Sequence, residues 1–284
     1  MRFSEDRIEK LSCSDGVQRN IHIWEPDKPR AVFLTVHGGM DHGGNYVTPA
    51  LYLKEKGFAT VAQDQNGHDM KRKVVIPRFE VFLDDLELML EWVKQNYVGV
   101  PIFFLSHSMG GLIIIHYGLK RFKGDPLVKG FIISSPYWAN AIKTPKIMEK
   151  LAGVLAVLTP RMKVPIEDIR DHVTHDKEIM KRQREDERDG IMASGASARF
   201  AAELLKAQAW IPDHIATWKH PMLVIVAGDD KLADSAATKE LLKKVNPEYL
   251  TELWYPDNFH ENFNELNRED VFARIVEWCE PRIK

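Results

Sequence analysis

The chain has 284 residues, enough for one large α/β domain or two small ones. Its apolar and charged fractions, 44% and 28%, are ordinary for a globular protein, and a net charge of −2 without a basic tail argues against a nucleic-acid partner. No signal peptide and no run of about 18 apolar residues is visible, and Cys13 and Cys279 suggest no disulfide framework. We therefore expect a cytoplasmic protein, possibly peripheral to a membrane.

Short apolar segments alternate with helical patterns over the first half of the chain. Apolar runs, or alternation of apolar and polar residues, predict strands at 20–24, 31–36, 57–62, 101–105 and 128–133. Apolar residues at helical spacing predict helices at 79–96 and 111–119. Such interleaving is typical of a mostly parallel sheet with helices on both faces.

The alternation breaks over residues 139–218, which contain no strand-like run. The patterns there predict an apolar helix at 147–158, a charge-dense helix with a solvated face at 176–189, and an amphipathic helix at 196–210. Strands at 222–226 and 249–255 and helices at 236–245 and 270–279 then complete the sheet. We expect a core made of 1–138 and 219–284, interrupted by a helical cap at 139–218.

Ser108 lies between an apolar strand and an apolar helix, within Ser106-His107-Ser108-Met109-Gly110. A serine at a sharp strand-to-helix turn is the layout of a nucleophile elbow, in which the helix N-terminus faces the reaction site. Ser106 replaces the first glycine of the usual Gly-x-Ser-x-Gly pattern, a mild departure because serine is also small. A serine beside glycines also suits an ordinary turn, so the pattern alone leaves both interpretations open.

The acid and the base of such a site follow the serine along the chain. Asp230 comes after the predicted strand at 222–226, and His260 comes after the last predicted strand. We expect Asp230 to fix the tautomer of His260 and His260 to take the proton of the serine. Asp229 and Asp234 compete with Asp230, Gly-Asp-Asp is also a good turn sequence, and the alternative for His260 is a surface-loop histidine.

The glycine-rich segment 37–46 follows the strand at 31–36. In nucleophile-elbow hydrolases one oxyanion amide comes from this loop and the other from the residue after the nucleophile. This assigns Gly39 and Met109 to the oxyanion hole. The alternative is a glycine-rich surface turn, whereas a phosphate-binding loop is disfavoured because no Gly-Lys-Ser/Thr follows.

The same loop contains His37, Asp41 and His42, which imitate a metal cluster. They lack clear zinc-ligand spacing, so we expect neither a metal nor a cofactor.

Taken together, these motifs resemble the monoacylglycerol lipase and lysophospholipase group of α/β-hydrolases. The matching pieces are residues 37–46, 64–68, 107–111, 229–234 and His260, and the similarity spans nearly the whole chain, including an insertion where that family has its cap. The sequence departs from the family pattern at Asp41, Asn45, Asn66, Asp69 and Ser106.

The resemblance implies an α/β-hydrolase fold with Ser108, Asp230 and His260 as a catalytic triad. It implies Gly39 and Met109 as the oxyanion amides. It also implies that Asp41 and His107 lie near the pocket for the leaving alcohol.

We accordingly expect a serine hydrolase that cleaves carboxylic esters of single-chain acyl lipids, foremost monoacylglycerols, through an acyl-enzyme. The alternatives are a general carboxylesterase or lysophospholipase on the same scaffold and a catalytically silent binding module. Epoxide or haloalkane hydrolysis is disfavoured, because those relatives have an aspartate where Ser108 stands. The predicted apolar helix at 147–158 either packs between cap and core or forms a lid that contacts a membrane or micelle surface. The sequence leaves the oligomeric state open.

Overall fold

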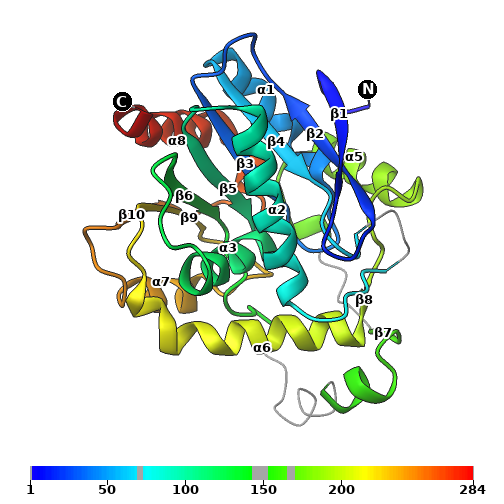
Figure 1. Cartoon of the computed structure of the whole chain (residues 1–284). Coiled ribbons are helices and arrows are strands. Elements are labelled where there is room, and N and C mark those ends of the chain that lie inside the picture. The colour runs from blue at the N-terminus through cyan, green and yellow to red at the C-terminus, as the bar shows by residue number, and fades with distance from the viewer. Residues whose placement is uncertain (1, 69–72, 143–152, 165–169, 284) are drawn as a thin grey trace.

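A computed structural model of the chain describes residues 2–68, 73–142, 153–164 and 170–283 (Figure 1). One sheet of eight strands crosses the molecule in the order β1-β2-β4-β3-β5-β6-β9-β10. β1 and β2 pair antiparallel, as do β2 and β4, and all the other neighbouring pairs are parallel. The strands are β1 (Arg7–Ser12), β2 (Gln18–Trp24), β3 (Ala31–Val36), β4 (Phe58–Gln63), β5 (Ile102–His107), β6 (Val128–Ser134), β9 (Met222–Ala227) and β10 (Leu250–Tyr255).

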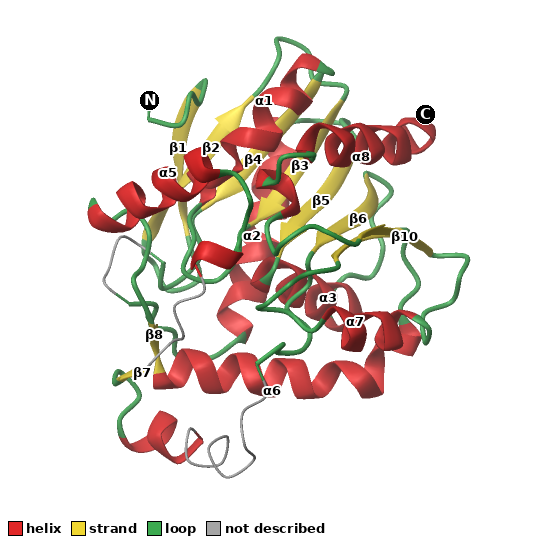
Figure 2. Ribbon diagram, turned by 180° about the vertical axis from the view of Figure 1, so that it is seen from behind, coloured by secondary structure: helices red, strands yellow, loops and turns green. Residues whose placement is uncertain are grey.

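The central strands are apolar because helices cover the sheet on both faces. Every residue of β3, β4, β5 and β9 is buried. One face packs against α1 (Val47–Glu55) and α8 (Arg268–Ile283), which lie on the viewer's side of the sheet in Figure 2. The other packs against α2 (Glu80–Asn96), α3 (Met109–Lys120) and α7 (Ser235–Leu242), and α6 (Ala198–His214) packs against α3. The predicted α/β-hydrolase architecture is therefore confirmed.

β1 was not predicted. Its residues alternate between half-buried and exposed along a charged sequence, because it is the edge strand and rests on the sheet by one face only. We expected no strand within 139–218. This prediction is also wrong, because β7 (Lys163–Val164) and β8 (Ala196–Ser197) pair there.

The chain between β6 and β9 includes α5 (Lys177–Arg188) and α6 among its described elements. The predicted apolar helix at 147–158 lies partly outside the described residues, but 153–158 are helical. In this part Val154, Val157 and Leu158 are 54%, 70% and 74% exposed, so it is not buried on all sides.

The predicted charge-dense helix is α5, and Asp176 caps it by accepting hydrogen bonds from the amides of Glu178 and Ile179. Its face is not solvated throughout. Asp186 is fully buried and pairs with Arg2, whose Nη2 lies 2.6 Å from Asp186 Oδ1. The beginning of the chain thus holds this helix in place. None of the described helices is both long enough and apolar enough to cross a bilayer.

The start of α3 lies so close to β3 that Gly110 leaves no room for a side chain. A Cβ atom there would lie 1.9 Å from the carbonyl oxygen of Val36. On Gly111 it would lie 2.5 Å from Ile133 Cγ2. The need for glycine at the end of the elbow pattern therefore comes from contact between two backbones.

Replacing Gly110 with alanine is expected to lower the free energy of unfolding by ~2–3 kcal/mol, because backbone atoms must move to admit the methyl group. Urea denaturation measures this loss. Gly153→Ala is the control: a Cβ at Gly153 meets nothing within 4 Å, so we expect a change under ~1 kcal/mol. A Gly110→Ala protein as stable as the wild type would contradict the close contact.

Candidate active site

Ser108 occupies the turn between β5 and α3. Its backbone is left-handed, with φ 55° and ψ −118°, a conformation that is strained for any residue with a side chain. Four backbone hydrogen bonds hold it there: its amide donates to the Ser134 carbonyl at 3.0 Å, and its carbonyl accepts from the amides of Gly111, Leu112 and Tyr137. The predicted strand-to-helix turn is present, and it brings Ser108 into a pocket at the edge of the sheet.

His260 and Asp230 meet at the same pocket although they follow different strands. His260 Nδ1 lies 2.7 Å from Asp230 Oδ2. The other carboxylate oxygen of Asp230 accepts from the amides of Leu232 and Ala233 at 2.8 and 2.9 Å. These amides orient the carboxylate toward His260. Among the described residues His260 Nε2 has no hydrogen-bond partner, so this nitrogen remains available on the buried ring.

The two competing aspartates do not contact His260. Asp229 is partly exposed and pairs with Lys231. Asp234 caps α7 by accepting from the Ala237 amide at 2.9 Å. Of the three candidates, only Asp230 hydrogen-bonds to the histidine.

Opposing effects act on the charge of His260. Burial, the largest single effect, disfavours the charged imidazole, but the charge and hydrogen bond of Asp230 together with the charge of Glu261 outweigh it, so the pKa of His260 is raised. The His107 ring lies beside it, with 4.7 Å between ring centroids. Burial, together with the charge of His260, lowers the pKa of His107 well below its ordinary value. His107 is therefore neutral at pH 7.

Gly39 and Met109 lie beside each other near Ser108, since a Cβ on Gly39 would be 3.7 Å from Met109 Sδ. In the described part of the chain, neither amide donates to a backbone carbonyl. These two N–H groups are thus free to bind an oxyanion, as an oxyanion hole requires.

A buried histidine holds the loop that contains Gly39. The Gln65 amide donates to His37 Nε2 at 3.0 Å, so the proton of His37 is on Nδ1, which lies 2.8 Å from the Gly38 carbonyl. The Gln65 side chain donates to the His37 carbonyl at 2.6 Å. Burial lowers the pKa of His37 well below its ordinary value, which keeps the ring neutral.

The resulting histidine geometry does not suit a metal site. No group of three or more His, Cys, Asp or Glu side chains within the described ranges could hold a metal ion. Both ring nitrogens of His37 are engaged in the loop, and His42 Nε2 faces Asp186 of α5 at 3.7 Å.

The pocket at Ser108 has a volume of about 270 Å³, and both Asp41 and His107 line it. Asp41 is buried and accepts from the His42 amide at 2.8 Å and from Asn45 Nδ2 at 3.2 Å. Burial raises the pKa of Asp41 to about 6. The other lining residues are Gly38, Gly39, Met40, Val173, Met180, Gln183, Arg184, Glu187, Met192, Ala193, Ser194, Leu232, His260 and Glu261.

Gln183, Arg184 and Glu187 of α5 line this pocket, and sequence analysis missed this role of the helix and its contacts with nearby loops. Arg182 Nη2 donates to Asn45 Oδ1 at 2.5 Å, and Gln183 Nε2 donates to Glu261 Oε1 at 2.8 Å. Both belong to the charge run that was interpreted as a solvated face. The helical spacing of this run predicts the helix but does not indicate what the helix packs against.

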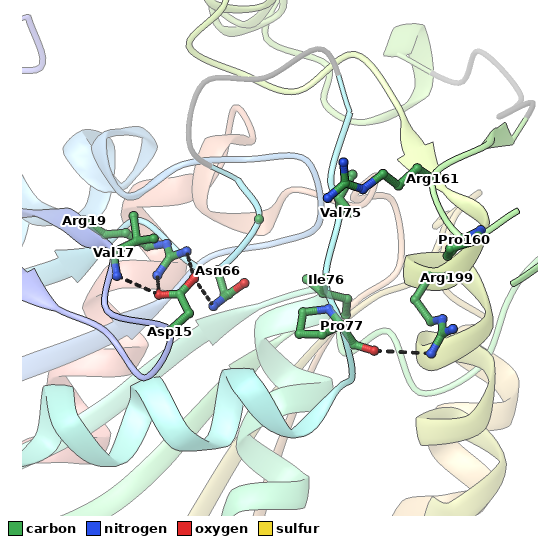
Figure 3. Close-up of a pocket in the computed structure, with 11 residues that line it drawn as sticks. Asp15, Val17, Arg19, Asn66, Val75, Ile76, Pro77, Pro160, Arg161 and Arg199 are labelled. Atoms are coloured by element: carbon green, nitrogen blue, oxygen red, sulfur yellow. Dashed lines mark hydrogen bonds and ion pairs between the residues drawn. The ribbon is translucent and has the colours of Figure 1, made fainter. Parts of the chain in front are cut away.

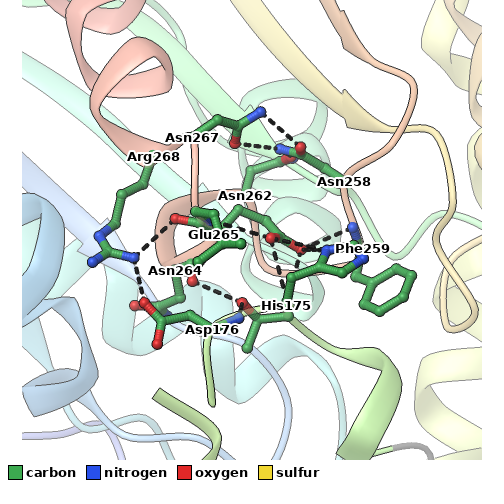
Figure 4. A network of polar contacts seen from close by, with 11 residues as sticks. His175, Asp176, Asn258, Phe259, Asn262, Asn264, Glu265, Asn267 and Arg268 are labelled. Atoms are coloured by element: carbon green, nitrogen blue, oxygen red, sulfur yellow. Dashed lines mark hydrogen bonds and ion pairs between the residues drawn. The ribbon is translucent and has the colours of Figure 1, made fainter. Parts of the chain in front are cut away.

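A second missed feature is the network that holds the His260 loop (Figure 4). Glu265 is 2% exposed and accepts from the Phe259 amide at 3.0 Å, while His175 Nδ1 lies 3.1 Å from the same oxygen. Arg268 Nη1 donates to Asp176 Oδ2 at 2.7 Å. The segment before α5 and the loop of His260 are therefore joined through one buried carboxylate and one ion pair.

Comparisons with known proteins point to one family. A family model described as "Serine aminopeptidase, S33" (Hydrolase_4) matches residues 27–267. Phospholipase YtpA of Bacillus subtilis is 30% identical over 253 residues, which cover 88% of this chain and 95% of the relative. A monoacylglycerol lipase of Mycolicibacterium smegmatis is 27% identical and covers 93% of both chains. The crystal structure of Paleococcus ferrophilus monoacylglycerol lipase has the same fold, with a TM-score of 0.80 at 22% identity over 94% of this chain and 100% of that one.

Asp230→Asn is expected to lower the pKa of His260 by at least ~1 unit, because burial then acts without the opposing carboxylate. NMR titration of the imidazole measures this shift.

In the wild type the raised pKa of His260 also affects stability. The pair of His260 and Asp230 stabilises the fold below about pH 6.5, and this contribution is lost as the pH rises through the folded-state pKa of His260.

Asp229→Asn is the matched control, since Asp229 pairs with Lys231 and does not contact His260. It should leave the titration of His260 unchanged. Equal shifts in the two variants would show that Asp230 does not govern the charge of His260.

Proposed function

The chain belongs to the Hydrolase_4 family of α/β-hydrolases, and we propose that it is a serine hydrolase of single-chain acyl esters, foremost monoacylglycerols, acting through Ser108, His260 and Asp230. At the coarser level it is a carboxylic ester hydrolase with relatives named for lipid esters. The observation that supports the finer proposal is that the strained turn of Ser108 lines the same pocket as a histidine whose ring is oriented by Asp230 and whose Nε2 has no described partner.

In the proposed reaction His260 Nε2 takes the proton of Ser108 as Oγ attacks the ester carbonyl. The carbonyl oxygen becomes an oxyanion that the amides of Gly39 and Met109 bind, each worth ~3 kcal/mol. Collapse of this intermediate breaks the bond to the alcohol, which leaves with the proton from His260. Water, deprotonated by His260, then attacks the acyl-enzyme in the same way. The fatty acid is released and Ser108 regains its proton from His260.

Asp230 keeps the proton of His260 on Nδ1 and stabilises the imidazolium that forms in each step. The neutral His107 beside His260 does not compete for the proton, since its pKa is lowered well below its ordinary value.

We interpret residues 139–218 as a cap that supplies one wall of the substrate pocket. Val173, Met180 and Met192 of this segment line the pocket and suit an acyl chain, since each buried methylene gains ~0.8 kcal/mol. The pocket also has a polar part: Asp41, which accepts a hydrogen bond from Asn45, suits the hydroxyls of a leaving alcohol. The exposed Val154, Val157 and Leu158 suit transient contact with a membrane or micelle that presents the substrate.

A lysophospholipase is the second candidate, and the charge of the pocket favours it. Asp41, Glu187 and Glu261 line the pocket together with one lining cation, Arg184. These acidic groups suit the ammonium end of a lysophospholipid's leaving group, such as glycerophosphocholine or glycerophosphoethanolamine.

Ser108→Ala should reduce hydrolysis of a medium-chain p-nitrophenyl ester by at least ~10³-fold, because the nucleophile is lost. Initial rates at fixed protein concentration measure this. Ser106→Ala is the matched control: it loses one hydrogen bond to the Ile132 carbonyl, costs ~1 kcal/mol of stability and should keep its turnover. Retained turnover in the Ser108 variant would remove Ser108 from the mechanism.

A substrate panel separates the two candidates. Monoacylglycerol, triacylglycerol and lysophosphatidylcholine of matched chain length are compared by kcat/KM. The proposal predicts at least ~10-fold preference for monoacylglycerol over the other two, because a triacylglycerol must place further chains in a pocket of about 270 Å³. A preference for lysophosphatidylcholine would assign the lysophospholipase activity instead.

A further inference from the structure

A second and larger pocket lies away from Ser108, with a volume of about 500 Å³ (Figure 3). This volume falls within the ~300–1,000 Å³ of small-molecule sites. Its walls come from the turn between β1 and β2, the loop after β4, the segment before α2, and residues near β7 and α6. The lining residues are Asp15, Val17, Arg19, Asn66, Gly67, Val75, Ile76, Pro77, Pro160, Arg161 and Arg199.

The acidic group of this pocket is already neutralised. Arg19 donates to both carboxylate oxygens of Asp15, at 2.8 and 2.7 Å, and the Val17 amide and Asn66 add further bonds. The hydrogen bonds from Arg19 lower the pKa of Asp15 to about 2. Asp15 therefore has little remaining capacity to pair with another cation.

Two other guanidinium groups line the pocket without a counter-charge. Figure 3 shows Arg161 and Arg199 on the side opposite Asp15 and Arg19. Within the described residues, neither forms an ion pair with a carboxylate. Among the described residues, Arg199 donates to the carbonyls of Ala156 and Pro77, at 3.0 and 3.4 Å. Because Asp15 and Arg19 offset each other, the described lining of the pocket has an excess of two positive groups, Arg161 and Arg199.

The rest of the wall is apolar. This part of the wall consists of Val17, Val75, Ile76, Pro77 and Pro160. Val17 is 42% exposed and belongs to neither apolar cluster of the core, so its side chain is accessible to a ligand. A ligand that satisfies both parts of this pocket has an anionic head for the guanidinium groups and an apolar chain for the wall.

We propose that this pocket, the Arg161 pocket, is a binding site for a single-chain amphiphile with an anionic head group. The source that fits the proposed function is the free fatty acid released by ester hydrolysis, and to that extent the inference rests on that function. The phosphate of a membrane lipid has the same chemistry, so the test separates the two sources.

The experiment is isothermal titration of decanoate into Ser108→Ala protein, which excludes turnover. In this background Arg161→Glu should remove one binding event or weaken it at least tenfold, because it replaces an unpaired cation by an anion. Arg161 is exposed and its side chain forms no bond within the described structure, so the variant is expected to fold. Arg188→Glu, at an exposed arginine of α5 outside the pocket, is the matched control and should leave the titration unchanged.

A second variant, Val17→Trp, tests the apolar wall by filling it from an exposed position. It should weaken decanoate at least fivefold and leave the binding of inorganic phosphate unchanged. Decyltrimethylammonium, which has the same chain with the opposite charge, should show no binding that depends on Arg161. Equal decanoate binding in Arg161→Glu and Arg188→Glu overturns the proposal, as does phosphate binding as tightly as decanoate.

Vesicles separate the two sources of the ligand. Fatty-acid binding predicts that sedimentation of the wild type with phosphatidylglycerol vesicles does not depend on Arg161. If Arg161→Glu reduces sedimentation with these vesicles while the protein does not bind decanoate, the fatty-acid assignment is overturned in favour of a lipid head group. No part of this experiment uses turnover, so its failure is distinguishable from failure of the proposed ester hydrolysis, which the Ser108 variant reports.

Discussion

The backbone of Ser108 is the constraint on which the candidate site depends. A serine at φ 55° costs ~1–3 kcal/mol and persists only where its surroundings determine it. Here the carbonyl of Ser134, on the adjacent strand β6, binds the serine amide, and the amide of Tyr137 binds the serine carbonyl. Gly110 lets α3 begin against the carbonyl of Val36 in β3. The order β3-β5-β6 of the sheet thus positions the hydroxyl, and the same turn leaves the Met109 amide free at the helix N-terminus.

The histidine side of the site depends on a different set of contacts. His260 lies in a loop after the edge strand β10, where the sheet itself provides little support. Asp230 orients its ring, and Glu265 accepts a hydrogen bond from the preceding amide, of Phe259, while it also contacts His175. The segment between β6 and β9, to which His175 belongs, therefore contributes to the position of the histidine loop as well as to the pocket wall. Movement of this segment would change both together.

Much of this arrangement was predictable from sequence. β3, β4, β5 and β9 are buried along their whole length, so they appear as continuous apolar runs, and Ser108 and Asp230 follow two of them. His260 follows the half-buried edge strand β10, and the three residues come in the order that the elbow motif requires. β1 was not predictable in this way, because an edge strand with charged residues resembles a loop. Nor was the burial of Asp186, since its cation, Arg2, is 184 positions away and local charge patterns show no such pairing. The contact between Arg182 and Asn45 was missed for the same reason.

The central claim is that Ser108 is the activated nucleophile, and covalent labelling tests it most directly. The protein is treated with a fluorophosphonate ester, and the adduct is counted by intact mass and located by peptide mapping. A hydroxyl activated by His260 predicts one adduct per chain, on Ser108, and a rate of labelling that rises with pH through the raised pKa of His260. No adduct, or an adduct on a different residue, would contradict the account.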